Sequence, residues 1–226
     1  MIKAVIFDLD GTLVTFNLDV RACRTEAINY LAEQGFPRNL FSMNETAFDM
    51  LVKAKQYLKT EKDCVKEFAQ IEKQVFLIVE SYELEAAKTN QLFSGVPETL
   101  RALKEMKLKL GLCTISGEKA TNYVLNKFSL FHFFDAIVTR ESVPAVKPHP
   151  AHLEATLDAL DVSADEALLV GDSVKDVACA DQLKVLAVGE TTGLSTAEKL
   201  AQSGANYVAS SVNEIPFLVK QINKED

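Results

Sequence analysis

From about residue 92 to the C-terminus, short apolar runs alternate with stretches of helical periodicity. The runs have the length of buried strands, and helical spacing of apolar residues follows each of them. This pattern predicts strands at residues 109–114, 136–139, 167–171, 185–189 and 207–209, and helices at 96–106, 117–128, 150–160, 174–182, 196–203 and 212–222. Strands that alternate with helices of this length are connected by right-handed crossovers, so we expect a parallel sheet with helices on both faces.

The N-terminal segment adds one strand and is followed by a purely helical region. Residues 4–7 form a short apolar run that stops at Asp8, and no strand pattern follows until about residue 90. Apolar spacing instead predicts helices at 19–34, 44–58 and 61–87. We therefore predict a doubly wound α/β core domain formed by residues 1–14 and 92–226, with an α-helical cap domain, residues 15–91, inserted after the first strand.

Composition limits the classes of partner. The 226 residues are 48% hydrophobic and 25% charged, which is typical of a globular protein, and the formal charge is −8. An acidic chain is a poor default partner for nucleic acid, whereas one or two cations suffice to bind a small phosphorylated molecule. We expect no membrane association, because no apolar run has the length of a membrane span, and a cytoplasmic location, because no leader pattern opens the chain.

The cysteines and histidines do not indicate a metal site. Cys23, Cys64, Cys113 and Cys179 are far apart and lack CxxC pairing, so we expect reduced, structural thiols. The three histidines also lack a third ligand at metal-binding spacing.

Polar side chains of complementary types follow several predicted strands. Because the carboxyl ends of parallel strands meet at one edge of a sheet, we expect these side chains to converge there. The candidates are Asp8 and Asp10, Thr114, Lys147, and Asp172 and Asp176. Carboxylates suit a hard cation such as Mg²⁺, and two of them two residues apart repel each other unless a cation or a shared proton intervenes. A hydroxyl and an ammonium group suit phosphate oxygens.

Each candidate also has an ordinary structural interpretation. Thr114 can simply end a strand, Lys147 can be an exposed loop lysine, and Asp172 with Ser173 can cap a helix. Asp176 can stabilise the first turn of that helix. Their occurrence in order, at one predicted edge, favours the catalytic interpretation.

Four motifs resemble those of the haloacid dehalogenase (HAD) superfamily. They are DLDGT at residues 8–12, Thr114, Lys147-Pro148, and GDSVKD at residues 171–176. The helical insertion is in a position similar to the cap of the phosphoglycolate phosphatase and β-phosphoglucomutase branch. In this sequence Ile115 follows Thr114, so we expect only its backbone N–H to serve the phosphate site, and whether Ser116 reaches it stays open.

The resemblance implies a role for each motif residue. Asp8 would attack phosphorus to form an aspartyl-phosphate, and Asp10 would protonate the leaving alcohol and then deprotonate the attacking water. Thr114 and Lys147 would hold the transferring phosphoryl group, with backbone groups of Leu9, Asp10 and Ile115. Mg²⁺ would be held by Asp8, the backbone carbonyl of Asp10 and Asp172, while Asp176 would orient metal-bound water or ligate the metal.

The predicted function is a Mg²⁺-dependent phosphomonoesterase that acts on a small phosphorylated metabolite. A phosphotransferase or mutase of the β-phosphoglucomutase type is the main alternative, but residues 17–27 lack the His-x-x-Ala-Trp motif by which such mutases resemble one another. Asp10 argues against a dehalogenase, because the dehalogenases of the superfamily lack the second Asp. A non-catalytic binding protein of this fold would be expected to lose a catalytic carboxylate, and all are present.

Substrate identity depends on the predicted cap. Candidate contacts for a second charged group of the substrate are Asn17, Arg21, Arg24 and Lys119. Each of these positions also fits a solvated helix face.

Overall fold

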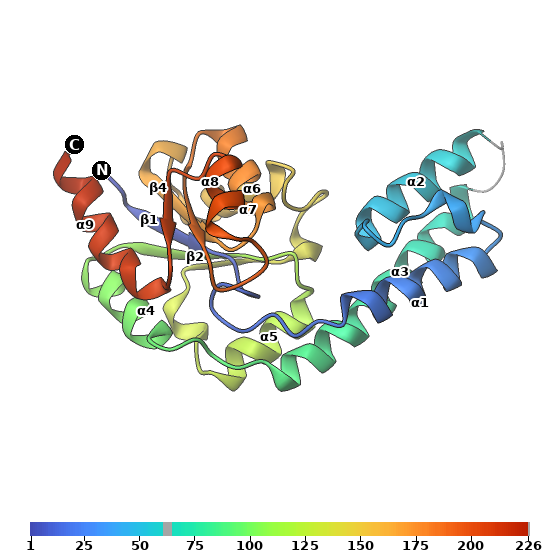
Figure 1. Ribbon diagram of the computed structural model, residues 1–226, viewed down its shortest axis with the longest axis horizontal. Helices are drawn as coiled ribbons and strands as arrows, with labels where there is room; N and C mark the ends of the chain where they lie inside the picture. The colour runs from blue at the N-terminus through green and yellow to red at the C-terminus, as the bar shows by residue number, and fades with distance from the viewer. Residues whose placement is uncertain (61–64, 226) are drawn as a thin grey trace. The chain divides into compact units, whose positions relative to one another are not determined.

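The computed structural model describes residues 1–60 and 65–225 and divides into two compact units (Figure 1). One unit comprises Met1–Phe16 and Thr89–Asp226, and the other comprises Asn17–Lys88. Cys64 and the predicted start of the third helix, at residue 61, lie outside the described residues.

The first unit is built on a six-stranded parallel sheet with the strand order β3-β2-β1-β4-β5-β6. The strands are β1 (Ala4–Phe7), β2 (Lys109–Cys113), β3 (Ala136–Val138), β4 (Ala167–Gly171), β5 (Leu186–Glu190) and β6 (Tyr207–Ala209). Every residue of the neighbouring central strands β1 and β4 is buried. The strand order reverses between β1 and β4, and in doubly wound folds ligands bind at the carboxyl ends of the strands beside such a reversal.

Helices cover both faces of this sheet. They are α4 (Val96–Glu105), α5 (Glu118–Lys127), α6 (Ala151–Leu160), α7 (Val174–Leu183), α8 (Ala197–Gln202) and α9 (Ile215–Glu225). Figure 1 shows α6, α7 and α8 on one face and α4, α5 and α9 on the other. Leu153 and Leu157 of α6 and Val177 of α7 pack with Ile6 and Leu169 of the sheet in one buried apolar cluster. The predicted doubly wound α/β architecture is therefore confirmed.

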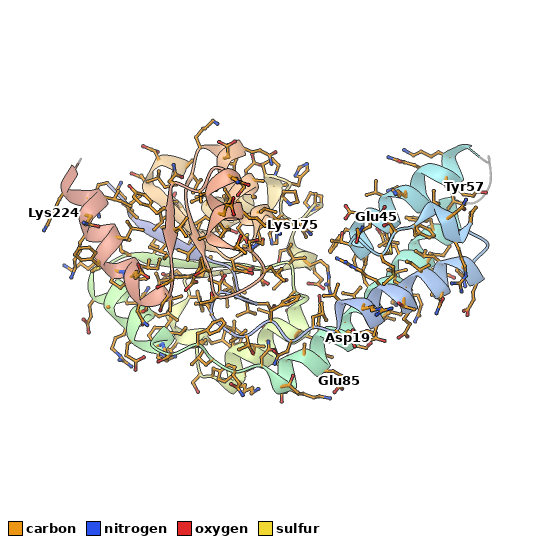
Figure 2. The ribbon with its side chains drawn as sticks, viewed as in Figure 1. Asp19, Glu45, Tyr57, Glu85, Lys175 and Lys224 are labelled. Atoms are coloured by element: carbon orange, nitrogen blue, oxygen red, sulfur yellow. The ribbon has the colours of Figure 1, made fainter. Side chains whose placement is uncertain are left out.

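The second unit is helical, as predicted for the inserted region. It contains α1 (Val20–Glu33), α2 (Ala47–Thr60) and most of α3 (Val65–Thr89). Its own core includes Leu31, Phe36, Met50 and Val75. Glu85 on α3 and Lys224 on α9 are examples of charged side chains that are exposed on the outside of each unit (Figure 2).

Most of the predicted elements differ from the observed ones by one or two residues at an end, but α2 and α9 each begin three residues later than predicted. The prediction for α2 starts at residue 44, whereas the structure begins this helix at Ala47. The hydroxyl of Thr46 accepts a hydrogen bond from the backbone N–H of Asp49 (3.2 Å), and the Asp49 carboxylate accepts one from the Thr46 N–H (2.9 Å). This reciprocal pair caps the first turn and sets the start of the helix.

No helix within the described residues is long and apolar enough to cross a membrane. Cys23, Cys113 and Cys179 are buried, and none of the three forms a disulfide.

Candidate active site

Three of the predicted carboxylates meet at the carboxyl ends of β1 and β4. Asp8 follows β1, Asp172 follows β4, and Asp176 lies in the first turn of α7. Oxygen atoms from the three side chains lie within 4.8 Å of one another. Parallel pairing of β1 with β4 produces this meeting, since the two strands end side by side.

Lys147 lies among these carboxylates and is itself buried, with 2% of its surface exposed. Its Nζ donates hydrogen bonds to Asp8 Oδ1 (2.8 Å), Asp176 Oδ1 (2.5 Å) and the Cys113 carbonyl (2.7 Å). An ammonium group has three N–H donors, so these bonds engage all of them. Burial alone would lower the pKa of Lys147, but the carboxylates of Asp176 and Asp8 outweigh burial and raise it. Lys147 therefore stays charged and fixes the orientation of Asp8.

The carboxylates carry more negative charge than one lysine neutralises. Burial, together with Asp176 and Asp172, raises the pKa of Asp8 well above its ordinary value, although Lys147 opposes the shift. Burial and the Asp176 charge raise the pKa of Asp172 to about 6, against the hydrogen bond from the backbone N–H of Leu194. A divalent cation among these oxygens would remove the repulsion, and oxygen ligands are the kind that Mg²⁺ binds.

Two glycines make room for Asp172. Its Oδ2 accepts a hydrogen bond from the Leu194 N–H at 2.6 Å. Gly11 adopts a φ of +89°, and a Cβ there would lie 2.6 Å from Asp172 Oδ2. A Cβ on Gly193 would overlap the same carboxylate oxygen. Only glycine fits at Gly11, because the left-handed backbone and the close approach both exclude a side chain.

Asp10 lies outside the cluster of three carboxylates and has its own partners. Ser116 Oγ donates to Asp10 Oδ2 at 2.6 Å, and Asn90 Nδ2 donates to Asp10 Oδ1 at 3.0 Å. Burial raises the pKa of Asp10, and the bonds from Ser116 and Asn90 partly oppose the shift. The sequence argument that Asp8 and Asp10 need a shared cation thus applies instead to Asp8 with Asp172 and Asp176.

The loop after β2 is held in shape around Thr114. Thr114 is 1% exposed, and its Oγ1 accepts a hydrogen bond from the Ser116 N–H at 3.1 Å. The Ile115 carbonyl accepts a bond from Arg140 Nη1 at 3.4 Å. Leu9, between the two aspartates, is fully buried, and its carbonyl accepts the Leu13 N–H at 2.9 Å. Phosphate binding by this loop and by Leu9 stays a prediction.

The four predicted substrate contacts lie in different units. Lys119 is exposed on α5 of the unit that holds the aspartates, whereas Asn17, Arg21 and Arg24 belong to the helical unit. Arg24 Nη1 donates to the Met43 carbonyl at 2.7 Å, so part of its guanidinium has a structural partner.

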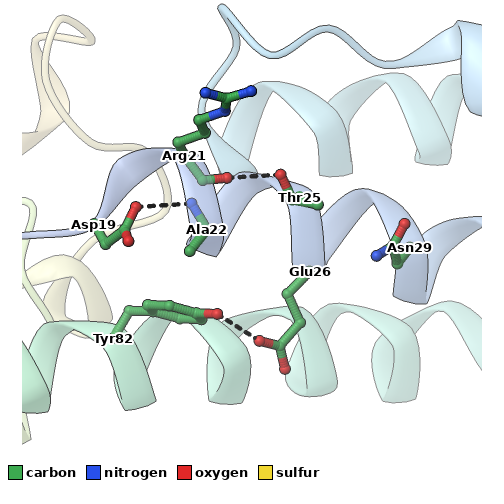
Figure 3. A pocket seen from close by; sticks show the side chains of 7 residues that line it. All are labelled: Asp19, Arg21, Ala22, Thr25, Glu26, Asn29 and Tyr82. Atoms are coloured by element: carbon green, nitrogen blue, oxygen red, sulfur yellow. Dashed lines mark hydrogen bonds between the residues drawn. The ribbon is translucent and has the colours of Figure 1, made fainter.

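Arg21 lines an open groove between α1 and α3 of the helical unit (Figure 3). Other polar groups of this groove bond to one another, as Tyr82 does by donating to Glu26 at 2.7 Å. Thr25 Oγ1 likewise donates to the Arg21 carbonyl at 2.8 Å. These bonds explain the groove as local packing of two helices.

Sequence analysis missed two buried ionisable residues near the site. His152 Nδ1 accepts a hydrogen bond from the Lys147 N–H at 3.3 Å, and burial with the nearby Lys147 charge lowers the pKa of His152 to about 4. Glu190 ends β5, and neither of its carboxyl oxygens has a hydrogen-bond partner within the described residues. Burial and the neighbouring Asp172 raise the pKa of Glu190 to about 8. Neither residue belongs to a recognisable motif, so only the fold reveals them.

Comparison with known proteins agrees with this geometry. The sequence pattern of the haloacid dehalogenase-like hydrolases matches residues 5–189. The chain belongs to this family. The resemblance drawn from the four motifs is thereby confirmed.

Relatives place this HAD-like hydrolase among phosphatases. It is 34% identical to a phosphoglycolate phosphatase of Cereibacter sphaeroides over 180 residues, which cover 78% of this chain and 79% of that protein. It is 27% identical to the pyrophosphatase PpaX of Bacillus mycoides, over 98% of this chain and 99% of that one. A β-phosphoglucomutase from Clostridium difficile has a similar fold, with a TM-score of 0.67, 20% identity, and coverage of 100% of this chain and 99% of that one. The protein is thus a HAD-type phosphatase.

Proposed function

We propose that this enzyme is a Mg²⁺-dependent phosphomonoesterase that hydrolyses a small phosphorylated metabolite through an aspartyl-phosphate on Asp8. The observation that carries the proposal is the position of Asp8, with its Oδ1 held by Lys147 at 2.8 Å and the carboxylates of Asp172 and Asp176 beside it. This arrangement provides a nucleophile fixed in orientation and a place for a cation at one sheet edge.

The residues present fit the cation. Asp8, Asp172 and Asp176 offer hard oxygen ligands within 4.8 Å of one another. Burial and the Asp176 charge together raise the pKa of Asp172, and a cation would relieve the repulsion between the two carboxylates. In the proposal Asp8, Asp172 and the Asp10 carbonyl hold Mg²⁺, and Asp176 orients metal-bound water or ligates the metal. When bound, Mg²⁺ neutralises charge on the phosphoryl oxygens and so lowers the cost of attack by a carboxylate.

The chain's own side chains then divide the reaction into two displacements. Because Lys147 binds Asp8 Oδ1, the other oxygen, Oδ2, is the attacking atom in the proposal. A bond from Oδ2 to phosphorus forms while the ester P–O bond breaks, and Asp10 gives its proton to the leaving oxygen. Asp10 then takes a proton from the water that attacks phosphorus, which releases phosphate and restores Asp8.

Phosphoryl binding falls to the loop after β2 and to the turn after β1. The proposed donors are the Thr114 hydroxyl, Lys147 and backbone N–H groups of Leu9, Asp10 and Ile115. Lys147 would share or exchange one of its three present bonds when phosphate arrives. Such preorganised donors stabilise charge that develops in the transition state.

The relatives suggest which substrates to test first. The names phosphoglycolate phosphatase and pyrophosphatase point to 2-phosphoglycolate and inorganic pyrophosphate. Asn17, Arg21, Arg24 and Lys119 remain the proposed contacts for a second charged group of the substrate.

Phosphate release from p-nitrophenyl phosphate with Mg²⁺ tests the proposal. We expect the Asp8→Asn variant to lose at least ~10³-fold in kcat, because removal of a covalent nucleophile can cost up to about 10⁶-fold. The matched control is Asp158→Asn, which changes an exposed carboxylate on α6 and should keep wild-type activity. Normal turnover by Asp8→Asn, or the absence of any Mg²⁺-dependent phosphate release by the wild type, would contradict the proposed function.

A further inference from the structure

Asn90 has an unusual position for a residue that no motif contains. It lies two residues after the helical unit ends at Lys88, and only 2% of it is exposed. Its Nδ2 donates to Asp10 Oδ1 at 3.0 Å, and its own Oδ1 is buried without a hydrogen-bond partner within the described residues. An unpaired buried amide oxygen costs free energy, so a purely structural role explains this residue poorly.

The backbone around Asn90 is fixed on both sides. Its carbonyl accepts a hydrogen bond from Lys127 Nζ at 2.7 Å. The next residues pair with the segment after Asp10, because the Thr15 N–H donates to the Gln91 carbonyl at 2.9 Å and the Phe93 N–H donates to the Leu13 carbonyl at 3.1 Å. The amide therefore meets Asp10 from a rigid support, as a group that orients another side chain requires.

Asn90 and Ser116 bind different oxygens of Asp10 with different chemistry. An amide NH₂ group can only donate, so it holds Oδ1 as an acceptor. The Ser116 hydroxyl, 2.6 Å from Oδ2, can donate to a carboxylate or accept from a carboxylic acid. The pair therefore leaves Oδ2 as the oxygen that can hold a proton while both hydrogen bonds are kept.

We propose that Asn90 is a positioning residue for proton transfer by Asp10: it holds Oδ1 so that Oδ2 delivers the proton to the leaving oxygen as the ester P–O bond breaks and the bond from Asp8 to phosphorus forms. This inference rests on the proposed function, in which Asp10 is the acid and base. It adds Asn90, which lies where the chain leaves the helical unit, to the residues that act in the first displacement.

Two aryl phosphates separate this role from a structural one. Phenol, like the tyrosine side chain, has a pKa near 10 and leaves poorly without a proton, whereas p-nitrophenol is far more acidic and leaves readily as the anion. The ratio kcat/KM reports steps up to the first irreversible displacement, so slow hydrolysis of the aspartyl-phosphate does not affect it. A positioning role for the acid predicts that the loss depends on the leaving group.

We expect Asn90→Ala to lower kcat/KM for phenyl phosphate at least ~10-fold more than for p-nitrophenyl phosphate, because general acid catalysis contributes ~10²–10⁴-fold where it is needed. Ser116→Ala, which removes the other bond to Asp10, should show the same leaving-group dependence and serves as the second variant. The control is Gln91→Ala, whose side chain is exposed and whose backbone bonds are kept, and it should leave the ratio of the two values unchanged.

Equal losses for both esters in Asn90→Ala and in Ser116→Ala would overturn the positioning role, and so would wild-type rates in both. A wild type that hydrolyses neither ester with Mg²⁺ would refute the proposed function itself. A wild type that hydrolyses both, with variants that lack leaving-group dependence, would refute only the role of Asn90.

Discussion

Glu190 is a carboxyl group that the fold buries beside Asp172. It is fully buried, and its pKa is raised to about 8 by burial and by the Asp172 charge. In the unfolded chain a glutamate titrates near 4.3, so between about pH 4.3 and 8 the folded state holds a proton that the unfolded state lacks. The contribution of Glu190 to the free energy of unfolding is therefore fully present below about pH 4.3. It is lost as the pH rises towards 8, by up to about 1.4 kcal/mol per pH unit.

Glu190→Gln removes this titration. We expect the free energy of unfolding of wild type relative to the variant to fall as pH rises from 5 to 8, measured by urea unfolding with a chelator present so that no cation reaches Asp172. The control, Glu154→Gln, replaces an exposed carboxylate on α6 and should show no such trend. A constant difference between wild type and Glu190→Gln across this range would mean that Glu190 is ionised in the folded state.

Residues of the site differ in how far the sequence reveals them. Asp8 and Asp172 could be predicted, because each directly follows an apolar strand and the ends of parallel strands meet. Asn90 could not, because its bond to Asp10 spans 80 positions and depends on how the chain returns from the helical unit. Glu190 was also missed, since the predicted strand stopped one residue early and left it outside the sheet.

At the scale of elements, the loop after β5 contacts Asp172 of the proposed cation site. This loop, residues 191–195, reaches Asp172 through the Leu194 N–H at 2.6 Å and the Ser195 N–H, which bonds the Asp172 carbonyl at 3.2 Å. Thr192 Oγ1 also donates to the Gly11 carbonyl at 2.6 Å, which joins the loop to the turn after β1. The loop therefore holds Asp172, a proposed metal ligand, in place through these hydrogen bonds.

Gly193 lets this loop approach Asp172, so a methyl group there should displace the carboxylate. We expect Gly193→Ala to raise the Mg²⁺ concentration for half-maximal phosphate release about 10–100-fold, the usual cost of disturbing a residue that supports a metal ligand. Gly204→Ala is the control: its φ is +99°, nothing lies within 4 Å of the added Cβ, and it should reduce stability without changing the Mg²⁺ requirement. An unchanged requirement in Gly193→Ala would show that this loop does not set the geometry of the site.

Elements with a strong local signal were predicted closely, and β4 matches its prediction at both ends. Errors arose where side chains decide a boundary. At α2 the exchange between Thr46 and Asp49 delays the helix, and before α9 the residues Val212–Glu214 form a separate tight turn. Apolar spacing alone does not detect such turns, because the residues within them keep a helix-like pattern.

For the whole molecule, the division into two units places the residues of the proposed active site in one unit. Asp8, Asp10, Lys147, Asp172 and Asp176 all belong to the unit formed by Met1–Phe16 and Thr89–Asp226. The segment just before the helical unit and the segment just after it pair with each other through an isolated bridge between Val14 and Leu92. Binding of a cation should therefore stabilise the unit that holds the sheet.

Thermal unfolding with and without Mg²⁺ measures that stabilisation. A ligand at 100 times its Kd that binds only the folded state adds about 2.7 kcal/mol, which for a chain of this size corresponds to a rise in Tm of about 5–10 °C. Asp172→Asn should abolish the Mg²⁺-dependent rise, because it removes one of the three clustered carboxylates. Asp158→Asn, on the exposed side of α6, should keep it. An unchanged Tm of the wild type at saturating Mg²⁺ would refute the metal site. Lys147 would then be the cation that offsets the repulsion between the carboxylates.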